Sequence, residues 1–414
     1  MMSKKIADNA CYTITTGLCF LALLLLPFQQ DFAMKSLRIA GEVALLAIFI
    51  SPRKYLKSDT IYIAISLLVL SILFFAWFRI YKTPDSEYVG AYMNYRDWSL
   101  VGIFSAFSLP VISTAREQFK KLTNYAHLAV SLVVITAYVV YSCYQYFILH
   151  DTRAILSLTY GPGAPAAAYT ITFISLYALI TVSTLVNKYR LPLLILIGFT
   201  SFIAISATAT RAGIFTYPLL FAFIFWKQVQ GYSSKQKKMG IYAFLALAVV
   251  SVSVLHEPIM KRVNDLRTDI IKYNADNSET SVGARFAMYQ TGLESSYNNY
   301  VGQPLEERNE KIKAIIADNK DLSGARHYLN VHLHNQLIDT LSTTGWLGVI
   351  LNIAFLLAVI RYIHKQHSSL MYTYVVALMM FSLSDTLTYS TPIPLAWLLT
   401  LLLMCSLVNN KVQN

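Results

Sequence analysis

Charged side chains are scarce in this sequence of 414 residues: Asp, Glu, Lys and Arg make up 14% of it, whereas a soluble domain holds about 25%. Apolar residues reach 56% before glycine is counted, against about 45–50% with glycine in a soluble domain. Such a chain has more apolar surface than a water-soluble globule can bury, so lipid must solvate much of it. This composition excludes a soluble enzyme, a secreted protein, a disordered chain and a nucleic-acid-binding module, despite a net charge of +12.

The usual signatures of metal and nucleophile chemistry are also missing. The four cysteines lie in apolar runs without a C-x-x-C pair, which is typical of small buried hydrophobic residues rather than of disulfides or zinc ligands. The sequence contains no Asp-x-Asp pair of the kind that holds a divalent ion against a nucleotide sugar, no H-E-x-x-H and no G-x-S-x-G. We therefore expect chemistry without a metal, a cofactor or a serine nucleophile.

Long apolar runs are what the sequence has instead, and a bilayer core needs about 20 apolar residues per helix. The first run follows Lys4 and Lys5, and without an A-x-A cleavage site it is interpreted as an uncleaved helix. The sequence thus predicts an all-α integral membrane protein with about 12 transmembrane helices. The twelve runs are 10–28, 37–51, 60–80, 98–115, 122–148, 165–187, 191–208, 212–227, 239–255, 340–362, 369–386 and 392–409.

Lys and Arg are distributed unevenly over the ends of these runs. One alternate set of loops, with the two termini, holds 17 of them, and the opposite short loops hold 7. Because cytoplasmic loops collect Lys and Arg, we expect a multi-pass protein with both termini in the cytoplasm. The basic excess is mainly a topology signal.

One large polar segment, 256–339, separates the first nine predicted spans (1–255) from the last three (340–414) and is expected on the outer face. Its apolar residues recur at helical spacing over 259–273, which predicts an amphipathic helix. A second helix is expected from Ser281, with Thr280 or Ser281 as its cap, and a third over 305–318. Amphipathic helices next to a bilayer lie along its surface, so this segment predicts a helical cap over the membrane bundle.

Two arginines have unusual surroundings. Arg211, in Thr210-Arg211-Ala212-Gly213, interrupts two apolar runs; it is either an interfacial Arg that reaches lipid head groups or an anion-binding Arg at the mouth of an external cavity. Arg285, in Ser281-Val282-Gly283-Ala284-Arg285, falls in the first turn of a helix, whose free N–H groups attract anions. An anionic partner would explain a cation there, and an ordinary surface Arg is the alternative.

Two of the eight histidines lie close together in His332-Leu333-His334-Asn335, just before the tenth run. In an extended backbone both rings point the same way. A metal pair is one interpretation, although no neighbouring carboxylate completes a site; polar capping of the following helix is another.

The order of these three motifs resembles the O-antigen ligase family, and residues 281–289 and 330–335 are similar to enterobacterial lipopolysaccharide ligases. The resemblance implies an inner-membrane glycosyltransferase of the GT-C type, with its active site facing the periplasm. It would transfer O-antigen from undecaprenyl pyrophosphate to a sugar hydroxyl of lipid A-core, so its partners would be these two lipids and the membrane.

Residue roles follow from the same resemblance. Arg211 and Arg285 match the family's pyrophosphate-binding arginines, and His334 matches its essential histidine, the expected general base. His332 and Asn335 are expected to support the site. Asp385, at the outer end of the eleventh run, is interpreted either as an orienting partner or as a polar residue at a helix end.

Other functions remain open at this stage. An O-antigen polymerase shares the donor and an arginine-rich outer segment, and a relative that glycosylates proteins would differ only in its acceptor. A twelve-span transporter of polysaccharide or ions is the alternative from another class, but transporters place charges near the middle of the membrane. Here the only clear acid inside a predicted span is Glu42.

Overall fold

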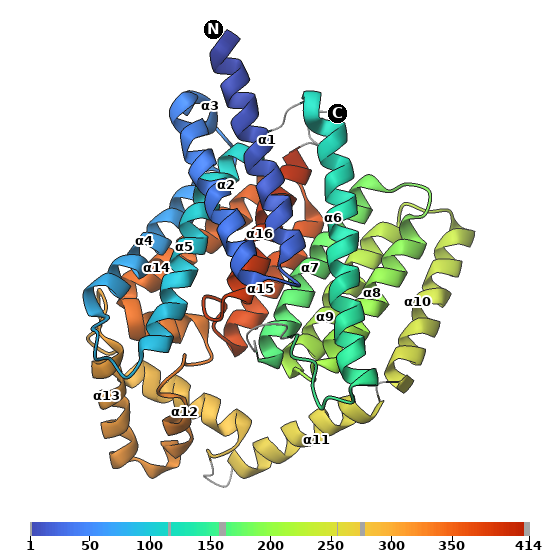
Figure 1. Ribbon diagram of the computed structural model, residues 1–414. Coiled ribbons are helices and arrows are strands. Elements are labelled where there is room, and N and C mark those ends of the chain that lie inside the picture. Colours follow the sequence, from blue (N-terminus) through green and yellow to red (C-terminus); the bar gives the residue numbers. More distant parts are fainter. Residues whose placement is uncertain (1, 115–116, 157–162, 255, 274–277, 410–414) are drawn as a thin grey trace.

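The computed structural model describes residues 2–114, 117–156, 163–254, 256–273 and 278–409, and within these ranges the chain forms helices and loops without a β-strand. The long bundle helices lie above a smaller outer group, α11–α13, which runs along their lower ends (Figure 1). The α-helices are α1 Met2–Leu25, α2 Gln30–Ile50, α3 Pro52–Tyr55, α4 Ile61–Tyr81, α5 Val89–Ile112, α6 Glu117–Cys143, α7 Ala164–Leu185, α8 Arg190–Ala207, α9 Arg211–Val229, α10 Ser234–Val254, α11 His256–Tyr273, α12 Ser281–Glu294, α13 Leu305–Asp318, α14 Gln336–Lys365, α15 Tyr372–Ser384 and α16 Pro392–Asn409. Shorter π or 3₁₀ turns are η1 Tyr144–Ile148, η2 Lys320–Tyr328 and η3 Ser369–Met371.

The all-α membrane character predicted from the sequence is confirmed. Each of the twelve apolar runs falls on a helix (α1, α2, α4–α10 and α14–α16). Within the described residues, seven helices are long and apolar enough to cross a membrane: α1, α4, α6 with η1, α7, α8, α9 and α14. Two more, α15 and α16, are apolar but shorter. The exact number of twelve spans therefore stays a prediction.

Several helices extend beyond the predicted runs. Helix α2 begins at Gln30 and α5 at Val89, before the runs predicted to start at 37 and 98. The reason is that their outer turns carry charged side chains, such as Lys35 and Arg96, which an apolar scan does not count. A helix continues through such residues as long as its backbone hydrogen bonds are satisfied.

Helix α7 forms the centre of the bundle. Nearly all of its residues from Ala164 to Ser183 are buried, and it packs against α6, α8 and α16. A helix that is apolar all round is stable only when other helices surround it. Helices α1, α4 and α14 lie further out and expose apolar side chains where lipid would contact them.

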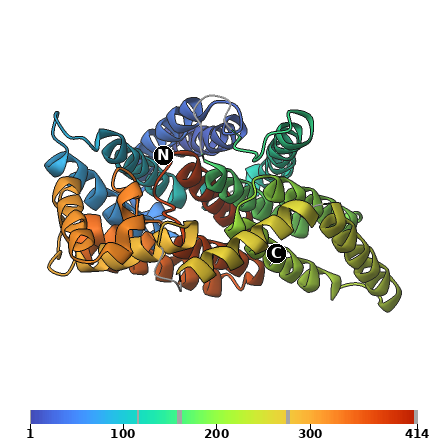
Figure 2. The same ribbon diagram turned by 90° about the horizontal axis from the view of Figure 1, so that it is seen from below.

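The three helices expected in the outer segment are confirmed. Helix α12 has Thr280, not Ser281, as its cap: the Thr280 hydroxyl accepts the N–H of Gly283. Helix α11 exposes apolar residues such as Val263 and Ile270, as expected of a helix that lies along a membrane surface. Seen from below, α11–α13 cross in front of the ends of the bundle helices (Figure 2). Helix α1 begins and α16 ends at the opposite end of the bundle (Figure 1).

A break in α14 ties the outer segment to the bundle. Gly345 has φ +71° and ψ −168°, which is not helical. The N–H groups of Trp346 and Leu347 donate instead to the carbonyls of Asn299 and Tyr300, at 3.2 and 3.1 Å. The predicted run 340–362 is therefore two helical pieces, and the outer one begins at Gln336.

Gly345→Ala should destabilise the protein by about 1–3 kcal/mol, because a side chain at this positive φ is strained. Its Cβ would also lie 2.6 Å from the carbonyl carbon of Tyr300. We expect a lower midpoint of thermal unfolding in detergent. Gly17→Ala is the matched control, since nothing lies within 4 Å of the added Cβ there, and equal midpoints for both variants would contradict this account.

Candidate active site

The His332–Asn335 motif forms the turn that leads into α14. The side chain of Asn335 caps that helix, accepting the N–H groups of Leu337 and Ile338 at 3.1 and 3.2 Å. The capping interpretation therefore holds for Asn335. His334, directly before it, has φ +50°, a left-handed conformation that costs energy in a residue other than glycine.

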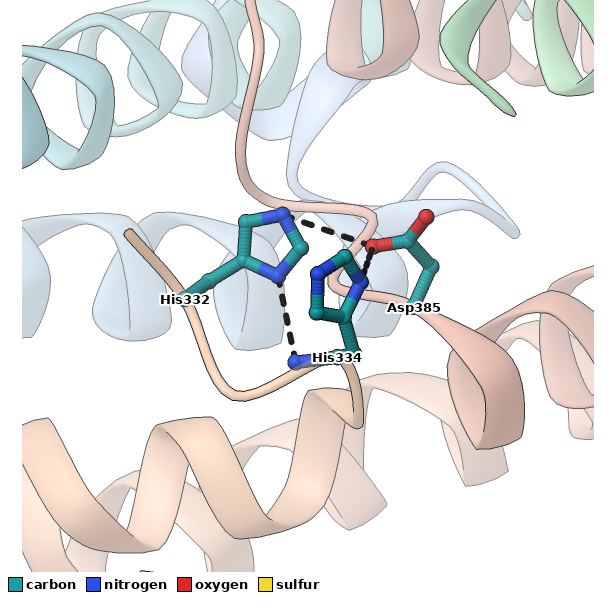
Figure 3. A group of neighbouring side chains, drawn as sticks. All are labelled: His332, His334 and Asp385. Atoms are coloured by element: carbon teal, nitrogen blue, oxygen red, sulfur yellow. Dashed lines mark hydrogen bonds and ion pairs between the residues drawn. The ribbon is translucent and has the colours of Figure 1, made fainter. Parts of the chain in front are cut away.

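Both imidazoles point at one carboxylate, that of Asp385, which follows α15 (Figure 3). Nδ1 of His334 lies 3.1 Å and Nε2 of His332 lies 3.4 Å from the same oxygen, Oδ1. The backbone N–H of Thr386 donates to this oxygen as well, at 2.9 Å. The orienting role expected for Asp385 is thus geometrically possible. The sequence-based statement that no carboxylate completes the histidine pair is wrong, because the carboxylate comes from 51 residues further along the chain.

These contacts fix which ring nitrogens carry hydrogen. The backbone N–H of His334 donates to Nδ1 of His332 at 3.2 Å, so the hydrogen of a neutral His332 is on Nε2, the nitrogen that lies 3.4 Å from Oδ1 of Asp385. A carboxylate can only accept, so Nδ1 of His334 is also a donor. In the neutral ring Nε2 of His334 is then an acceptor, which is the tautomer that a general base requires.

The charges of the group agree with this pattern. Burial acts to raise the pKa of Asp385, but His332, His334 and the Thr386 N–H outweigh it and hold this pKa below its usual range. Burial lowers the pKa of His332 to about 3, although the Asp385 charge acts in the opposite direction. At neutral pH the site therefore holds an ionised Asp385 beside a neutral His332.

His332 should make the protein sensitive to acid. In the unfolded chain this imidazole takes up a proton below about pH 6.5, whereas in the folded protein it stays neutral down to about pH 3. Between these two pH values His332 takes up a proton when the protein unfolds. This proton uptake lowers the free energy of unfolding by about 2 kcal/mol at pH 5, compared with a pH above 6.5. His332→Gln keeps a donor and an acceptor but does not titrate. We expect the variant to lose part of the decrease in thermal-unfolding midpoint between pH 7 and 5; identical pH slopes would refute this.

A buried ion pair holds the turn from behind. Arg308 of α13 is fully buried, and its Nη2 donates to the carbonyls of Leu329 and Val331 at 3.1 and 3.2 Å. Its Nη1 lies 3.8 Å from Oδ1 of Asp339. The same Asp339 oxygen accepts the N–H of Leu333 at 3.0 Å. Removing either partner would leave a buried charge uncompensated, so the pair fixes the backbone on which both histidines sit.

Arg285 lies beside the histidines. Its guanidinium is near enough to His332, Tyr289 and Tyr169 to act electrostatically on each. The hydroxyl of Tyr289, one turn along α12, donates to the carbonyl oxygens of His334 and Leu383, each at 2.9 Å. Within the described part of the chain no carboxylate forms an ion pair with Arg285. This guanidinium is therefore available to an anionic ligand.

Arg211 belongs to a neighbouring group of arginines. It begins α9 and pairs with Asp269 of α11, Nη1 to Oδ2 at 2.8 Å. Arg153 donates to the carbonyl oxygen of Thr208 at 2.9 Å, and burial, then Arg262 and Arg211, lower the pKa of Arg153. Tyr169 is within electrostatic range of both Arg153 and Arg285, so it links the two basic groups. Arg285 thus lies within electrostatic range of His332, whereas Arg211 is related to the histidines only through these intermediates.

Several of these residues are not marked by any local sequence pattern. Arg153 was one of seven basic residues in short outer loops, and Arg308 one of ten in the outer segment. Tyr289 lies in the stretch that resembles known ligases, but nothing set it apart. An Arg in a polar helix is usually solvated, and only packing shows that Arg308 is buried.

The His332, His334 and Asp385 ligand atoms lie within 4.8 Å of one another, so the three residues can hold a metal ion. In that arrangement, however, the nitrogens that face Asp385 would have to exchange their hydrogens for metal bonds. Oδ1 of Asp385 already accepts the N–H groups of His334 and Thr386, and Nε2 of His332 lies 3.4 Å from it.

Two comparisons with known proteins bear on this site. A family model described as O-antigen ligase matches residues 193–353, a range that contains Arg211, Arg285 and both histidines. A protein of Escherichia coli (strain K12) named O-antigen ligase is 24% identical over 408 residues, which cover 96% of this chain and 93% of that protein. The chain is thus similar to O-antigen ligases both within residues 193–353 and along nearly its whole length. This similarity indicates an enzyme of the glycosyltransferase type and confirms the resemblance seen in the three sequence motifs. Asp385 lies beyond the matched range of the family model, although the full-length similarity extends past it.

Proposed function

We propose that this enzyme ligates O-antigen to lipid A-core, taking the glycan from undecaprenyl pyrophosphate and joining it to a core sugar hydroxyl on the periplasmic side of the inner membrane. The similarity to O-antigen ligases supports the ligation itself. One observation carries the chemistry: the Asp385 carboxylate orients His334, whose Nε2 remains free to accept a proton, with the unpaired Arg285 beside it.

The proposed step uses His334 as the base. The acceptor hydroxyl gives its proton to Nε2 while its oxygen attacks the anomeric carbon of the donor. The bond from that carbon to the pyrophosphate oxygen breaks, and the electron pair leaves with the diphosphate. Asp385 stabilises the imidazolium that forms. Attack opposite the leaving group inverts the anomeric centre, and an NMR spectrum showing retention would exclude this step.

The arginines would bind the diphosphate. A guanidinium pairs with phosphate oxygens in a bidentate manner, and negative charge grows on the diphosphate as it leaves. Arg285 is free to do this, and Arg211 would exchange Asp269 for the ligand. Because pyrophosphate is a good leaving group, neither a general acid nor a metal is required in this mechanism.

Lysine should not replace these arginines. Arg285→Lys and Arg211→Lys keep the positive charge but lose the bidentate hydrogen bonds of the guanidinium. A hydrogen bond to a charged group contributes about 1.5–3 kcal/mol. We expect kcat/KM for the lipid-linked donor to fall about 10- to 100-fold, measured with purified enzyme. Arg267→Lys, at an exposed position on α11, is the control. Wild-type kinetics in both site variants would contradict the assigned role.

The orientation in the membrane is part of the proposal. The Lys and Arg bias over the loops places both termini in the cytoplasm. Helices α11–α13, which carry Arg285 and the residues around it, lie at the other end of the bundle (Figure 1). The segment 256–339 would then form a periplasmic cap on a GT-C-like bundle.

Deleting the gene tests the function as a whole. Loss of a ligase leaves lipid A-core bare while polymeric glycan accumulates on undecaprenyl carriers. Loss of a polymerase instead leaves core with a single repeat unit, and loss of a transporter traps the donor on the cytoplasmic side. Either of the latter two patterns would overturn the proposal.

A further inference from the structure

An apolar cavity of about 190 Å³ lies within the membrane bundle, next to the candidate active site. Its main walls are the facing sides of α14 and α15, and α4, α5 and α16 close the back. Apart from a few amides and hydroxyls, the walls are apolar, with Trp98, Phe355, Leu378 and Trp397 among the larger side chains. Such a cavity favours a hydrocarbon group over water.

The cavity has an edge toward the bilayer. Four of its lining residues are also exposed on the outside of the bundle, by 40–60% of their surface: Leu337 and Ile353 on α14, Met379 and Leu383 on α15. Since these are the surfaces that lipid would contact, a chain lying partly in the cavity can continue into the membrane between α14 and α15.

Its other end meets the catalytic group. Asn335, which lines the cavity, follows His334 in the chain, and Leu383, which also lines it, precedes Asp385 by two residues. Tyr289 donates to the carbonyl of Leu383 and lies near Arg285. This end of the cavity therefore lies on the Arg285 side of the site.

The chemistry of the two substrates in the proposed function decides which one can reach this cavity. In a prenyl pyrophosphate donor only the diphosphate separates the reacting anomeric carbon from the first isoprene unit. In lipid A-core the oligosaccharide separates the acceptor hydroxyl from the acyl chains. A hydrocarbon pocket beside the base and an anion-binding Arg thus fits the donor tail.

We infer that the cavity between α14 and α15 binds the isoprenoid tail of the donor at its diphosphate end. A cavity of about 150 Å³ with similar walls holds one benzene molecule, so 190 Å³ admits the first isoprene unit or two. The rest of the tail leaves between α14 and α15 into the bilayer. The inference rests on the proposed function and adds to it a contact by which the enzyme recognises the carrier independently of the glycan.

Filling the cavity tests this. Leu378→Trp places a larger ring inside it, whereas Val376→Trp adds the same ring on the lipid-exposed side of the same helix. With purified enzyme in liposomes, we expect Leu378→Trp to raise KM for the prenyl-pyrophosphate-linked glycan about tenfold and to leave KM for lipid A-core unchanged. Val376→Trp should behave as wild type. An unchanged donor KM, the same change in both variants, or a shift in acceptor KM would each overturn the inference.

A labelling experiment on the wild-type protein does not depend on how the variants fold. A donor with a diazirine on its first isoprene unit should cross-link to 352–356 and 378–383. Labelling elsewhere in the chain would overturn the inference. Labelling at these sites without any glycan transfer would leave the tail site intact and refute the ligase function instead.

Discussion

His334→Ala is expected to lower the rate of glycan transfer by about 10²–10⁴-fold, the usual contribution of a positioned general base. Nε2 of His334 is the ring nitrogen left free once Nδ1 has bonded Asp385, and alanine removes it. The Tyr289 bond to the His334 carbonyl involves only the backbone, so that contact survives. The measurement is kcat with purified enzyme, and the lipopolysaccharide ladder in cells.

Backbone strain must be separated from chemistry in that experiment. His334 has φ +50°, which alanine tolerates poorly and asparagine better. His334→Asn should therefore be as abundant as wild type and equally inactive. His327→Ala removes an exposed imidazole paired with Glu279 in the same outer segment and should keep full activity. A normal ladder from either His334 variant would rule out its role as the base.

Asp385→Asn is expected to lower kcat by a similar factor, about 10²–10⁴-fold, as loss of the orienting carboxylate does in a Ser-His-Asp triad. An amide can turn its NH₂ toward His334, which then bonds through Nδ1 as acceptor and carries its hydrogen on Nε2. This tautomer cannot take the acceptor's proton. The charge that would stabilise the imidazolium is also lost.

The measurements should distinguish a changed tautomer of His334 from a loss of folded protein as the cause of lower activity. Donor KM should change little in Asp385→Asn, because the arginines bind the diphosphate, while ¹⁵N NMR of histidine-labelled protein should show the hydrogen of His334 on Nε2. Asp321→Asn, at an exposed position of the outer segment, serves as control. Wild-type kcat, or a loss of activity explained by low abundance, would argue against Asp385 as the orienting residue.

The candidate site was only partly visible in the sequence. His332, His334 and Arg285 stand in short motifs, and the structure brings these three together. The sequence leaves two interpretations of Asp385, an orienting partner or a polar residue at a helix end. Its proximity to both imidazole rings depends on how α15 ends beside α14. Arg211 is interpreted from the sequence as an interfacial or an anion-binding Arg, and the resemblance implies pyrophosphate binding; the structure pairs it with Asp269. That pairing depends on where α11 crosses the end of α9, which no local pattern encodes.

The sequence by itself determined the membrane character, the helical class and the starts of the outer helices, such as Leu305 and Ser281. Apolar content, helical spacing and capping act between residues a few positions apart, so they can be read along the chain. Only the tertiary structure decided the Asp385 contacts, the break at Gly345, the burial of Arg308 and the cavity between α14 and α15. Each of these arises where helices distant in sequence pack together, and packing depends on the shapes of both partners at once.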